Sequence, residues 1–109
     1  MQEQSDILFR IRIAAEKKLL FLPHALRQML APERMIRNAE VRKTISHGEV
    51  IEDYPNDPRG HSCLVLGGGD ENRPLHVVCA PKEDYLAIIT AYLPDDREWS
   101  RDFKERVRK

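Results

Sequence analysis

The chain has 109 residues, of which 41% are hydrophobic and 33% charged, and its 18 basic side chains balance 18 acidic ones. This size and composition predict one domain over residues 1–109 and exclude a disordered acidic tail or a uniformly basic coat protein. No apolar run approaches the roughly 20 residues of a membrane span, and no secretion leader is recognisable at the amino terminus, so a cytoplasmic protein without membrane association is expected.

The first predicted element is an amphipathic helix over residues 5–16. Ser5 is a plausible cap, and apolar residues recur after it at helical spacing. Leu19 to Leu22 then form a short apolar run that stops at Pro23. Because a residue before proline is pushed toward extended geometry, we expect a brief strand or extended lead-in here.

Two further helices are predicted before residue 50. Pro23 suits the first turn of a short helix whose end is set by Pro32. Asn38 can cap the next helix, and the His47-Gly48 pair marks its end, since glycine adopts left-handed geometry without penalty.

After Gly48 the pattern changes to that of strands. Alternating or continuously apolar segments occupy residues 49–54, 62–66, 75–80 and 86–93, with turn residues between them. Four consecutive strands indicate an antiparallel meander. Beyond Pro94, the residues Trp99, Phe103 and Val107 recur every four positions and predict a terminal helix that packs through Trp99. The expected fold class is α+β.

Polar residues within the apolar strands are the first candidates for a functional site. His76 points opposite to its neighbours Leu75 and Val77, while Thr90 and Tyr92 share one face of the last strand, which also carries Leu86 and Ile88. The parity of the strand pairing is open: with one parity His76 lies opposite Thr90, and with the other it lies opposite Ile89.

A second group of candidates lies on the short helix that follows Pro23. His24 can share a helix face with Arg27, three residues later, or with Gln28, four residues later. Such spacing allows a proton-transfer group and a phosphate-holding cation to act on one substrate. For each histidine alone, a structural hydrogen-bonding role is the alternative.

Other chemistries find less support. Cys63 and Cys79 lack CxxC spacing and are expected to be buried, reduced thiols, and no ligand pair has the spacing of a structural zinc site, so no metal or other cofactor is expected. Glu52 and Asp53 adjoin in a strand and face opposite sides, which argues against paired-carboxylate chemistry. Acid-base chemistry by His, Tyr and Arg remains, and it matches RNA cleavage in which the substrate's own 2′-hydroxyl attacks.

Charge is distributed unevenly along the chain. The segments 1–47 and 97–109 are net basic, whereas residues 48–96 are net acidic. If folding brings the two basic segments together, they would form a face that attracts phosphate. The alternative is an ordinary solvated helix surface.

Several motifs, in this order along the chain, resemble a bacterial family of domains of unknown function. They are His24-Ala25-Leu26, Arg34-Met35-Ile36, Gly48 to Pro55, Ser62 to Gly67, Arg73 to Val78, Ile88 to Pro94 and Trp99. The resemblance covers roughly residues 22–103, so the helix over 5–16 is an addition. At the position four residues after His24, where the family usually has arginine, this chain has Gln28.

The family in turn is similar to small toxins related to RelE, BrnT and MqsR. That resemblance implies helices packed on a curved four-stranded antiparallel sheet and cleavage of messenger RNA. It also implies a cognate antitoxin as a partner, commonly a zinc-binding protein similar to MqsA. Self-association is left open.

The leading hypothesis is therefore a metal-independent endoribonuclease of toxin type, with RNA as its substrate. His24 or His76 would move protons, and Tyr92 and Thr90 would complete the pocket through their hydroxyls. The candidate substrate-binding residues are Arg27, Arg34, Arg73 and Arg101.

The rival hypothesis is a non-catalytic protein-binding module of the same fold, in which Tyr54, Tyr92 or Trp99 anchors a partner. The two hypotheses differ in space. An open basic cleft that joins His24, His76 and Tyr92 favours catalysis, whereas a closed cluster shielded by Trp99 favours a structural role.

Overall fold

The helical periodicity of the first half of the chain produces three α-helices. A computed structural model describes residues 3–107, with side chains from Asp6 onward, and contains α1 (Glu3–Lys17), α2 (Pro23–Leu30) and α3 (Asn38–His47). The three helices predicted before residue 50 are all present. The first begins at Glu3 rather than at the expected cap Ser5.

Local chemistry explains how α2 and α3 begin. Leu22 is extended (φ −71°, ψ 158°), and Pro23 opens α2, as expected for a proline in the first turn. The cap expected at Asn38 is wrong, because Asn38 lies inside α3 and Arg37 precedes the helix. There the carboxylate of Glu40 accepts a hydrogen bond from the backbone N–H of Arg37 (2.8 Å), which satisfies a free donor at the helix start.

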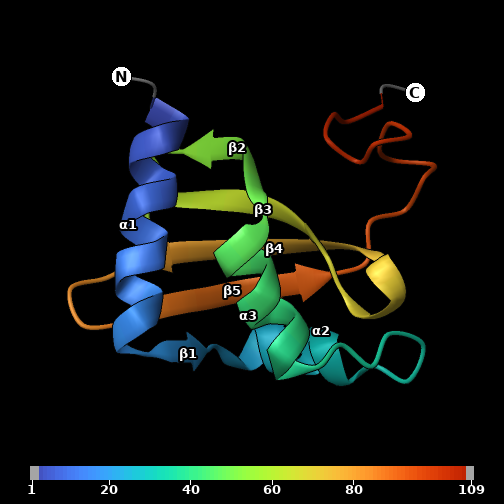
Figure 1. Cartoon of the computed structure of the whole chain (residues 1–109), viewed down its shortest axis with the longest axis horizontal. Helices are drawn as coiled ribbons and strands as arrows, with labels where there is room; N and C mark the ends of the chain where they lie inside the picture. The colour runs from blue at the N-terminus through green and yellow to red at the C-terminus, as the bar shows by residue number, and fades with distance from the viewer. Residues whose placement is uncertain (1–2, 108–109) are drawn as a thin grey trace.

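The strands form one mixed sheet in the order β1-β5-β4-β3-β2 (Figure 1). Their bounds are β1 Leu19–Phe21, β2 Glu49–Tyr54, β3 Ser62–Gly68, β4 Pro74–Pro81 and β5 Leu86–Tyr92, and a short 3-10 turn, Asp70–Asn72, joins β3 to β4. The strands β2 to β5 form the predicted antiparallel meander.

The predicted four-stranded antiparallel sheet is wrong in one respect: β1 pairs with β5 in parallel and adds a fifth strand. For the segment before Pro23 the sequence left a brief strand or an extended lead-in open, and the structure has the strand. Its backbone groups satisfy those of the β5 edge, which would otherwise be unpaired. The fold is therefore α+β with a five-stranded mixed sheet.

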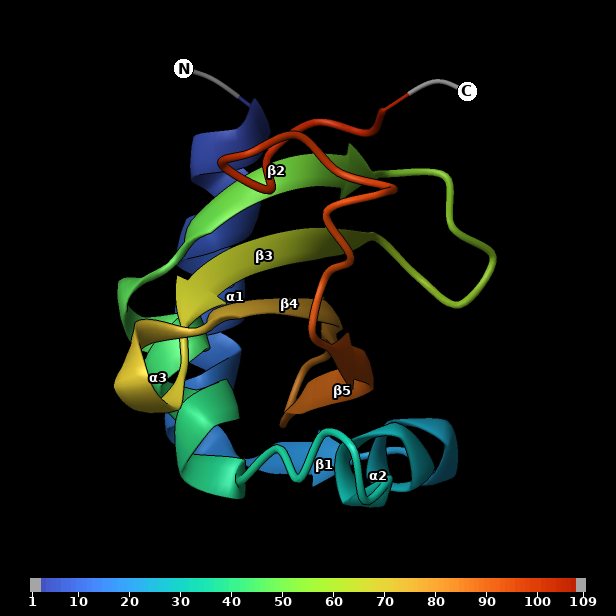
Figure 2. The same cartoon turned by 90° about the vertical axis from the view of Figure 1, so that its right-hand side faces the viewer.

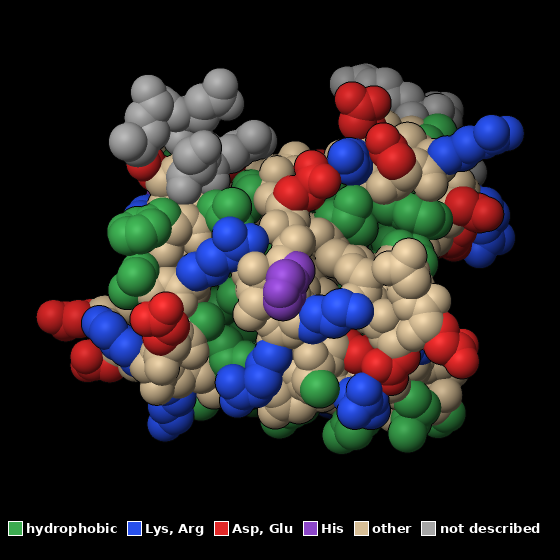
Figure 3. All heavy atoms as spheres, in the orientation of Figure 1, with side chains coloured by type: hydrophobic (Ala, Val, Ile, Leu, Met, Phe, Trp, Pro, Cys, Tyr) green, Lys and Arg blue, Asp and Glu red, His purple; other side chains and the backbone are tan. Residues whose placement is uncertain are grey.

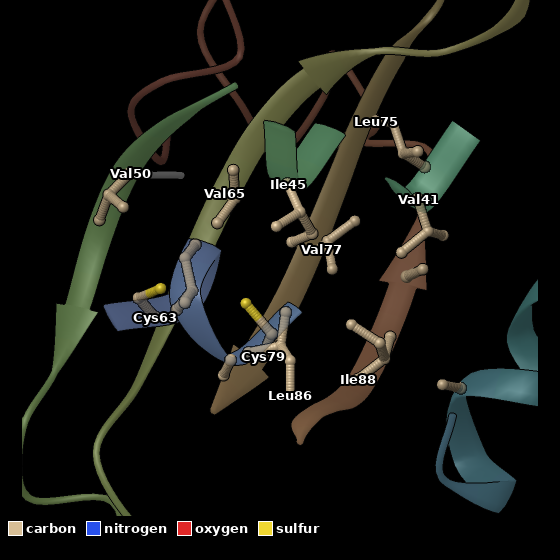
Figure 4. Packing of buried hydrophobic residues seen from close by; sticks show 14 of the residues in the cluster. Val41, Ile45, Val50, Cys63, Val65, Leu75, Val77, Cys79, Leu86 and Ile88 are labelled. Carbon is tan, nitrogen blue, oxygen red and sulfur yellow. The ribbon is translucent and has the colours of Figure 1, made fainter. Parts of the chain in front are cut away.

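The hydrophobic core lies between one face of this sheet and the helices α1 and α3 (Figures 1 and 4). Alternate strand residues point into it, among them Val65, Val77 and Ile88, and they meet Val41 and Ile45 of α3. Helix α2 closes the core beside β5, which it contacts through buried Ala25 and Met29. We call this sheet face the core face and the opposite one the second face.

The helix end predicted at Gly48, after α3, is correct, but the reason for the glycine differs from the expected one. It is extended (φ −82°, ψ −173°), so the expected left-handed geometry is wrong. Glycine is needed because a Cβ there would lie 2.5 Å from the carbonyl oxygen of Thr44 and would also clash with that of Leu66. The chain thus passes from α3 to β2 in close contact with β3.

The predicted C-terminal helix is absent, and residues 94–107, here called the strap, run irregularly along the second face (Figure 2). Short polar side chains bond nearby backbone groups instead: Asp95 accepts from the N–H of Arg97 (2.8 Å), and the Ser100 hydroxyl accepts from the N–H of Glu105 (3.1 Å). These local turns compete with a helix. Trp99 is nevertheless buried, as predicted.

The two basic segments of the sequence do not merge into one face. Lys and Arg side chains lie on the face formed by α1 and α3 (Figure 3), whereas Lys104 and Arg106 of the strap pair with Glu49 and Glu52 of β2. The strap is thus held partly by the acidic middle of the chain. Within residues 3–107, no helix is long and apolar enough to cross a membrane.

Candidate functional site

The second face of the sheet carries the polar strand residues singled out from the sequence. His76 lies opposite Tyr92, and Val78 lies opposite Thr90, so His76, Thr90 and Tyr92 share this face. Of the two parities left open, the structure has the one that places them together, but in a register that puts Tyr92 rather than Thr90 across from His76.

A β-bulge separates Thr90 and Tyr92 from the apolar half of β5. The register between β4 and β5 shifts after Val78, and Ile89 has no partner on β4. Leu86 and Ile88 therefore point into the core, so the prediction that they share a face with Thr90 and Tyr92 is wrong. An extra residue in one strand reverses the alternation beyond it.

His76 is completely buried, and both of its ring nitrogens have partners. Nε2 lies 2.9 Å from the backbone oxygen of Phe103, and Nδ1 lies 3.1 Å from the Tyr92 hydroxyl. A carbonyl only accepts, so Nε2 carries the proton and, in the neutral ring, Nδ1 accepts from Tyr92. Burial lowers the pKa of His76, although the Phe103 carbonyl acts in the opposite direction, and the ring is neutral at pH 7.

Trp99 of the strap closes the cluster. Its ring meets His76 edge to face with centroids 4.4 Å apart, and only 3% of the residue is exposed. The guanidinium carbon of Arg106 lies 4.7 Å from the Trp99 ring centroid. This guanidinium also donates two hydrogen bonds to Glu52, Nε to Oε2 (2.9 Å) and Nη2 to Oε1 (3.1 Å). The strap and the sheet are thus joined through one Trp-Arg-Glu stack.

The electrostatics of β2 follow from this stack. Burial alone would raise the pKa of Glu52, but hydrogen bonds from Arg106 and from the Tyr54 hydroxyl outweigh it and hold the pKa below its ordinary value. Burial and the bond to Glu52 raise the pKa of Tyr54 to about 12. At pH 7 the site therefore holds a carboxylate, an arginine cation and neutral phenols and imidazole.

His24 stands apart from this cluster. It is exposed near the start of α2, and within the described chain it makes no hydrogen bond or ion pair. On a helix, His24 and Gln28 lie on one flank, roughly opposite to Leu26 and Leu30. His24, His76 and Tyr92 do not form one open basic cleft. The arrangement around His76 is the closed cluster shielded by Trp99.

The predicted substrate-binding arginines have different environments. Arg34 donates to the side chain of Gln28, so its guanidinium lies beside the last turn of α2. Arg73 bonds the carboxylate of buried Glu40 (3.0 and 2.9 Å) and the carbonyls of Arg34 and Met35. Arg34 and Arg73 both line a hollow of about 600 Å³ together with the carboxylates of Asp70 and Glu71. Arg73 thus donates most of its N–H groups to acceptors within the chain.

The remaining predictions concern exposed arginines and buried thiols. Arg27 and Arg101 are exposed, and within the described chain neither has an ion-pair partner. Cys63 and Cys79 are buried and reduced, as predicted, and lie opposite each other on β3 and β4. Contact between the two thiols, together with burial, raises the pKa of Cys79. Among residues 3–107, no three His, Cys, Asp or Glu side chains are grouped so as to hold a metal ion.

Sequence reasoning missed the charged part of the site. Glu52 and Tyr54 lie on the second face because residues i and i+2 of a strand share a side, and this signal was readable. Glu52 does face away from Asp53, as expected, but it pairs with Arg106 rather than with another carboxylate. Arg106 lies in the segment for which the sequence predicts a helix that the structure does not have. Its contact with Glu52 could therefore not be predicted from the local sequence.

These observations define a class: an α+β domain whose five-stranded mixed sheet has an apolar face under two helices and a second face on which a strap covers His76. The chain belongs to the family described as Domain of unknown function (DUF4258), whose model matches residues 21–93. This confirms the expected membership in a family of unknown function. The match ends at residue 93 rather than at the expected 103, so helix α1 and the strap, including the expected motif residue Trp99, lie outside it. A search of curated proteins gave no match, and neither did a search of solved structures.

Proposed function

We propose that the protein is a metal-independent endoribonuclease of toxin type, with a RelE-like fold and candidate site residues both on the second face of the sheet and on the flank of α2. One observation carries the proposal. In the family-matched core, the polar side chains His76, Thr90 and Tyr92 lie on the second face, and Trp99, which seals His76, belongs to a segment outside that core. Buried titratable side chains with shifted pKa values are concentrated at functional sites.

The chemistry follows from the side chains. In RNA the 2′-hydroxyl attacks its own phosphate, so the protein needs to move protons and stabilise charge. Burial raises the pKa of Tyr92, which keeps the phenol protonated at pH 7. The neutral imidazole of His76 accepts from that hydroxyl and orients it. His76 is then a positioning residue, and exposed His24 is the proton-transfer candidate.

Arg34 supports the same proposal. Its guanidinium lies beside Gln28, on the helix flank that His24 also occupies. An arginine from the loop after α2 thus stands close to where the family usually has one on α2. Its planar donors suit a phosphate. A cognate antitoxin that covers this side would be the inhibitory partner.

A growth and RNA-integrity assay tests the proposal. The chain is expressed from a tightly repressed promoter, and wild type is compared with His24→Ala and Tyr92→Phe, while His47→Ala, an exposed histidine on α3, is the matched control. We expect growth arrest and RNA cleavage in wild type and in His47→Ala, and loss of both in the other two variants. Intact RNA with folded, abundant wild-type protein would refute the ribonuclease.

The second candidate is the non-catalytic protein-binding module, and a specific observation favours it. His76 has no exposed surface, and an apolar hollow of about 320 Å³ lies between α2 and the start of α3. Exposed Leu26, Leu30 and Met35 line it, whereas the anchors expected from the sequence, Tyr54, Tyr92 and Trp99, are half-buried or buried.

A tagged chain distinguishes this module from a ribonuclease. If it binds a protein partner, Leu30→Glu should abolish that binding. Phe9→Glu, at an exposed residue of α1, should leave the binding intact. Equal effects of the two changes would refute the α2 hollow as the binding surface.

A further inference from the structure

The contact between Arg106 and Glu52 has the geometry of a bound ligand. A flat guanidinium edge presents two parallel N–H groups, at 2.9 and 3.1 Å, to the two oxygens of one carboxylate. The face of the Trp99 indole lies 4.7 Å from the guanidinium carbon. The site thus recognises a planar group by two donors on its edge and an aromatic ring on its face.

Guanine carries the same donor edge. Its N1–H and its exocyclic amino group are two of the nitrogens of a guanidine unit built into the base, and both point the same way. Adenine and cytosine each offer one donor beside an acceptor nitrogen, and uracil offers one donor between two carbonyls. A carboxylate accepts two hydrogen bonds from guanine alone among the four, and RNA-binding proteins combine such edge contacts with stacking on aromatic rings.

We infer that Glu52 and Trp99 form a guanine-binding site, which Arg106 of the same chain occupies in this structure. As the site that selects a base in RNA, it rests on the proposed ribonuclease function. The Glu52 carboxylate reads the base edge, and Trp99 stacks on the base. Only the side chain of Arg106 has to move, because His76 and the sheet hold Trp99 in place.

Two features make Arg106 a replaceable occupant. Its side chain is 63% exposed, so it can exchange the contacts with Glu52 for water without unfolding the sheet. A hollow of about 470 Å³ beside it, lined in part by Arg97, Trp99 and Val107, gives room for a nucleoside next to the indole. Arg97 stands at this hollow in an ion pair with Asp95 (2.9 Å), and Glu98 lines it as well, so the hollow offers a nucleoside both charges beside the indole.

The strap itself carries a sign of strain at this place. Phe103, whose carbonyl accepts from His76, has φ +62°, in the left-handed region that a bulky residue rarely adopts. Strained residues are concentrated at ligand clamps and switch segments. The strap therefore holds Trp99 against His76 in a conformation maintained by tertiary contacts.

The test measures nucleotide binding without cleavage. Trp99 is the one tryptophan of the sequence, and stacking of a base on it quenches its fluorescence. Guanosine 5′-monophosphate and adenosine 5′-monophosphate are titrated into the full chain as wild type, Arg106→Ala and the double variant Arg106→Ala/Glu52→Gln. The control is Arg59→Ala, because Arg59 makes a similar two-point pair with Asp57 (3.0 and 2.9 Å) at another place.

We expect Arg106→Ala to bind the guanine nucleotide at least about tenfold more tightly than the adenine nucleotide, as a two-point contact to one base edge allows. Arg106→Ala should also bind the guanine nucleotide more tightly than wild type and Arg59→Ala do, because Arg106 no longer competes for Glu52 and Trp99. The double variant should lose the preference. Equal binding of both nucleotides, binding of neither, or a preference that survives Glu52→Gln would overturn the inference.

Two further measurements keep the outcomes separate. If the emission of Trp99 shows that Arg106→Ala releases the strap, the variant Arg106→Lys is used in place of Arg106→Ala. Lysine keeps a positive charge beside the Glu52 carboxylate but lacks the two-point donor edge of arginine. An RNA cleavage assay runs in parallel. Guanine-selective binding without cleavage would refute the ribonuclease and retain the site, whereas cleavage without guanine selectivity would refute the site alone.

Discussion

Replacing Glu40 with alanine should destabilise the fold more than any surface change of the same chemistry. Only 2% of Glu40 is exposed, yet its carboxylate accepts four hydrogen bonds. The donors are the backbone N–H groups of Arg37 and Asp70, both at 2.8 Å, and Nε and Nη2 of Arg73, at 3.0 and 2.9 Å. One side chain thus ties together the start of α3, the turn after β3 and the start of β4.

The expected loss is about 3 kcal/mol of unfolding free energy. Breaking a buried ion pair from one side costs about 3–5 kcal/mol, because the partner remains charged and unpaired. The lower end applies, because the Arg73 side chain is 31% exposed and keeps its bonds to the carbonyls of Arg34 and Met35. Domains have about 5–15 kcal/mol in total, so the variant would remain folded with a much lower melting temperature.

Urea unfolding followed by Trp99 fluorescence and by far-ultraviolet circular dichroism measures this loss. The matched control is Glu49→Ala, because Glu49 is exposed and makes one ion pair, with Lys104 at 3.2 Å. Such surface pairs contribute about 0.2–1 kcal/mol. If Glu40→Ala lost less than about 1 kcal/mol, or no more than Glu49→Ala, the carboxylate would not be the tie that its geometry indicates.

Three other changes follow from the structure. Thr44→Val should raise stability by about 1 kcal/mol in thermal unfolding, because the buried Thr44 hydroxyl has no hydrogen-bond partner within the described chain. Gly67→Ala should lower stability by about 1–3 kcal/mol, since its Cβ would lie 2.9 Å from the Cα of Thr44, whereas Gly68→Ala meets only the movable end of Asn72 and should cost less. The lowered pKa of His76 means that the unfolded chain takes up a proton before the folded one. Unfolding free energy should therefore fall as the pH drops below about 6.5, and chemical denaturation at several pH values should show a weaker fall in His76→Gln.

Local patterns predicted most of the elements, and long-range pairing explains the exceptions. The three helices and four meander strands follow from periodicity and from Pro23 and Gly48. The parallel pairing of β1 with β5 joins Leu19 to Leu86, and nothing within a short window encodes that contact. The bulge at Ile89 could not be predicted either, because β5 is a continuous apolar run around it, without an alternating pattern that a bulge would visibly interrupt.

The strap shows how a correct burial prediction can rest on a wrong element. Trp99, Phe103 and Val107 fit a helical period, but Ser100 and Asp102 offer side-chain acceptors that close turns over two to five residues. These turns form in place of a helix because the strap buries one large side chain, Trp99, rather than the continuous apolar face that would stabilise a helix. Arg106 reaches Glu52 only in this irregular conformation, so the charged part of the site was beyond sequence reasoning.

The two faces of the sheet have different energetic roles. The core face buries apolar side chains against α1 and α3, and this burial drives folding. On the second face, the contacts of Glu52, His76 and Arg106 replace contacts with water, and apolar residues of similar size would stabilise the fold as well or better. A polar cluster that contributes little stability and is covered by a segment outside the family core needs another reason to be present. Binding a ligand in place of Arg106 supplies that reason, because the same two acceptors and aromatic face that hold Arg106 would hold a planar base with two donors on its edge.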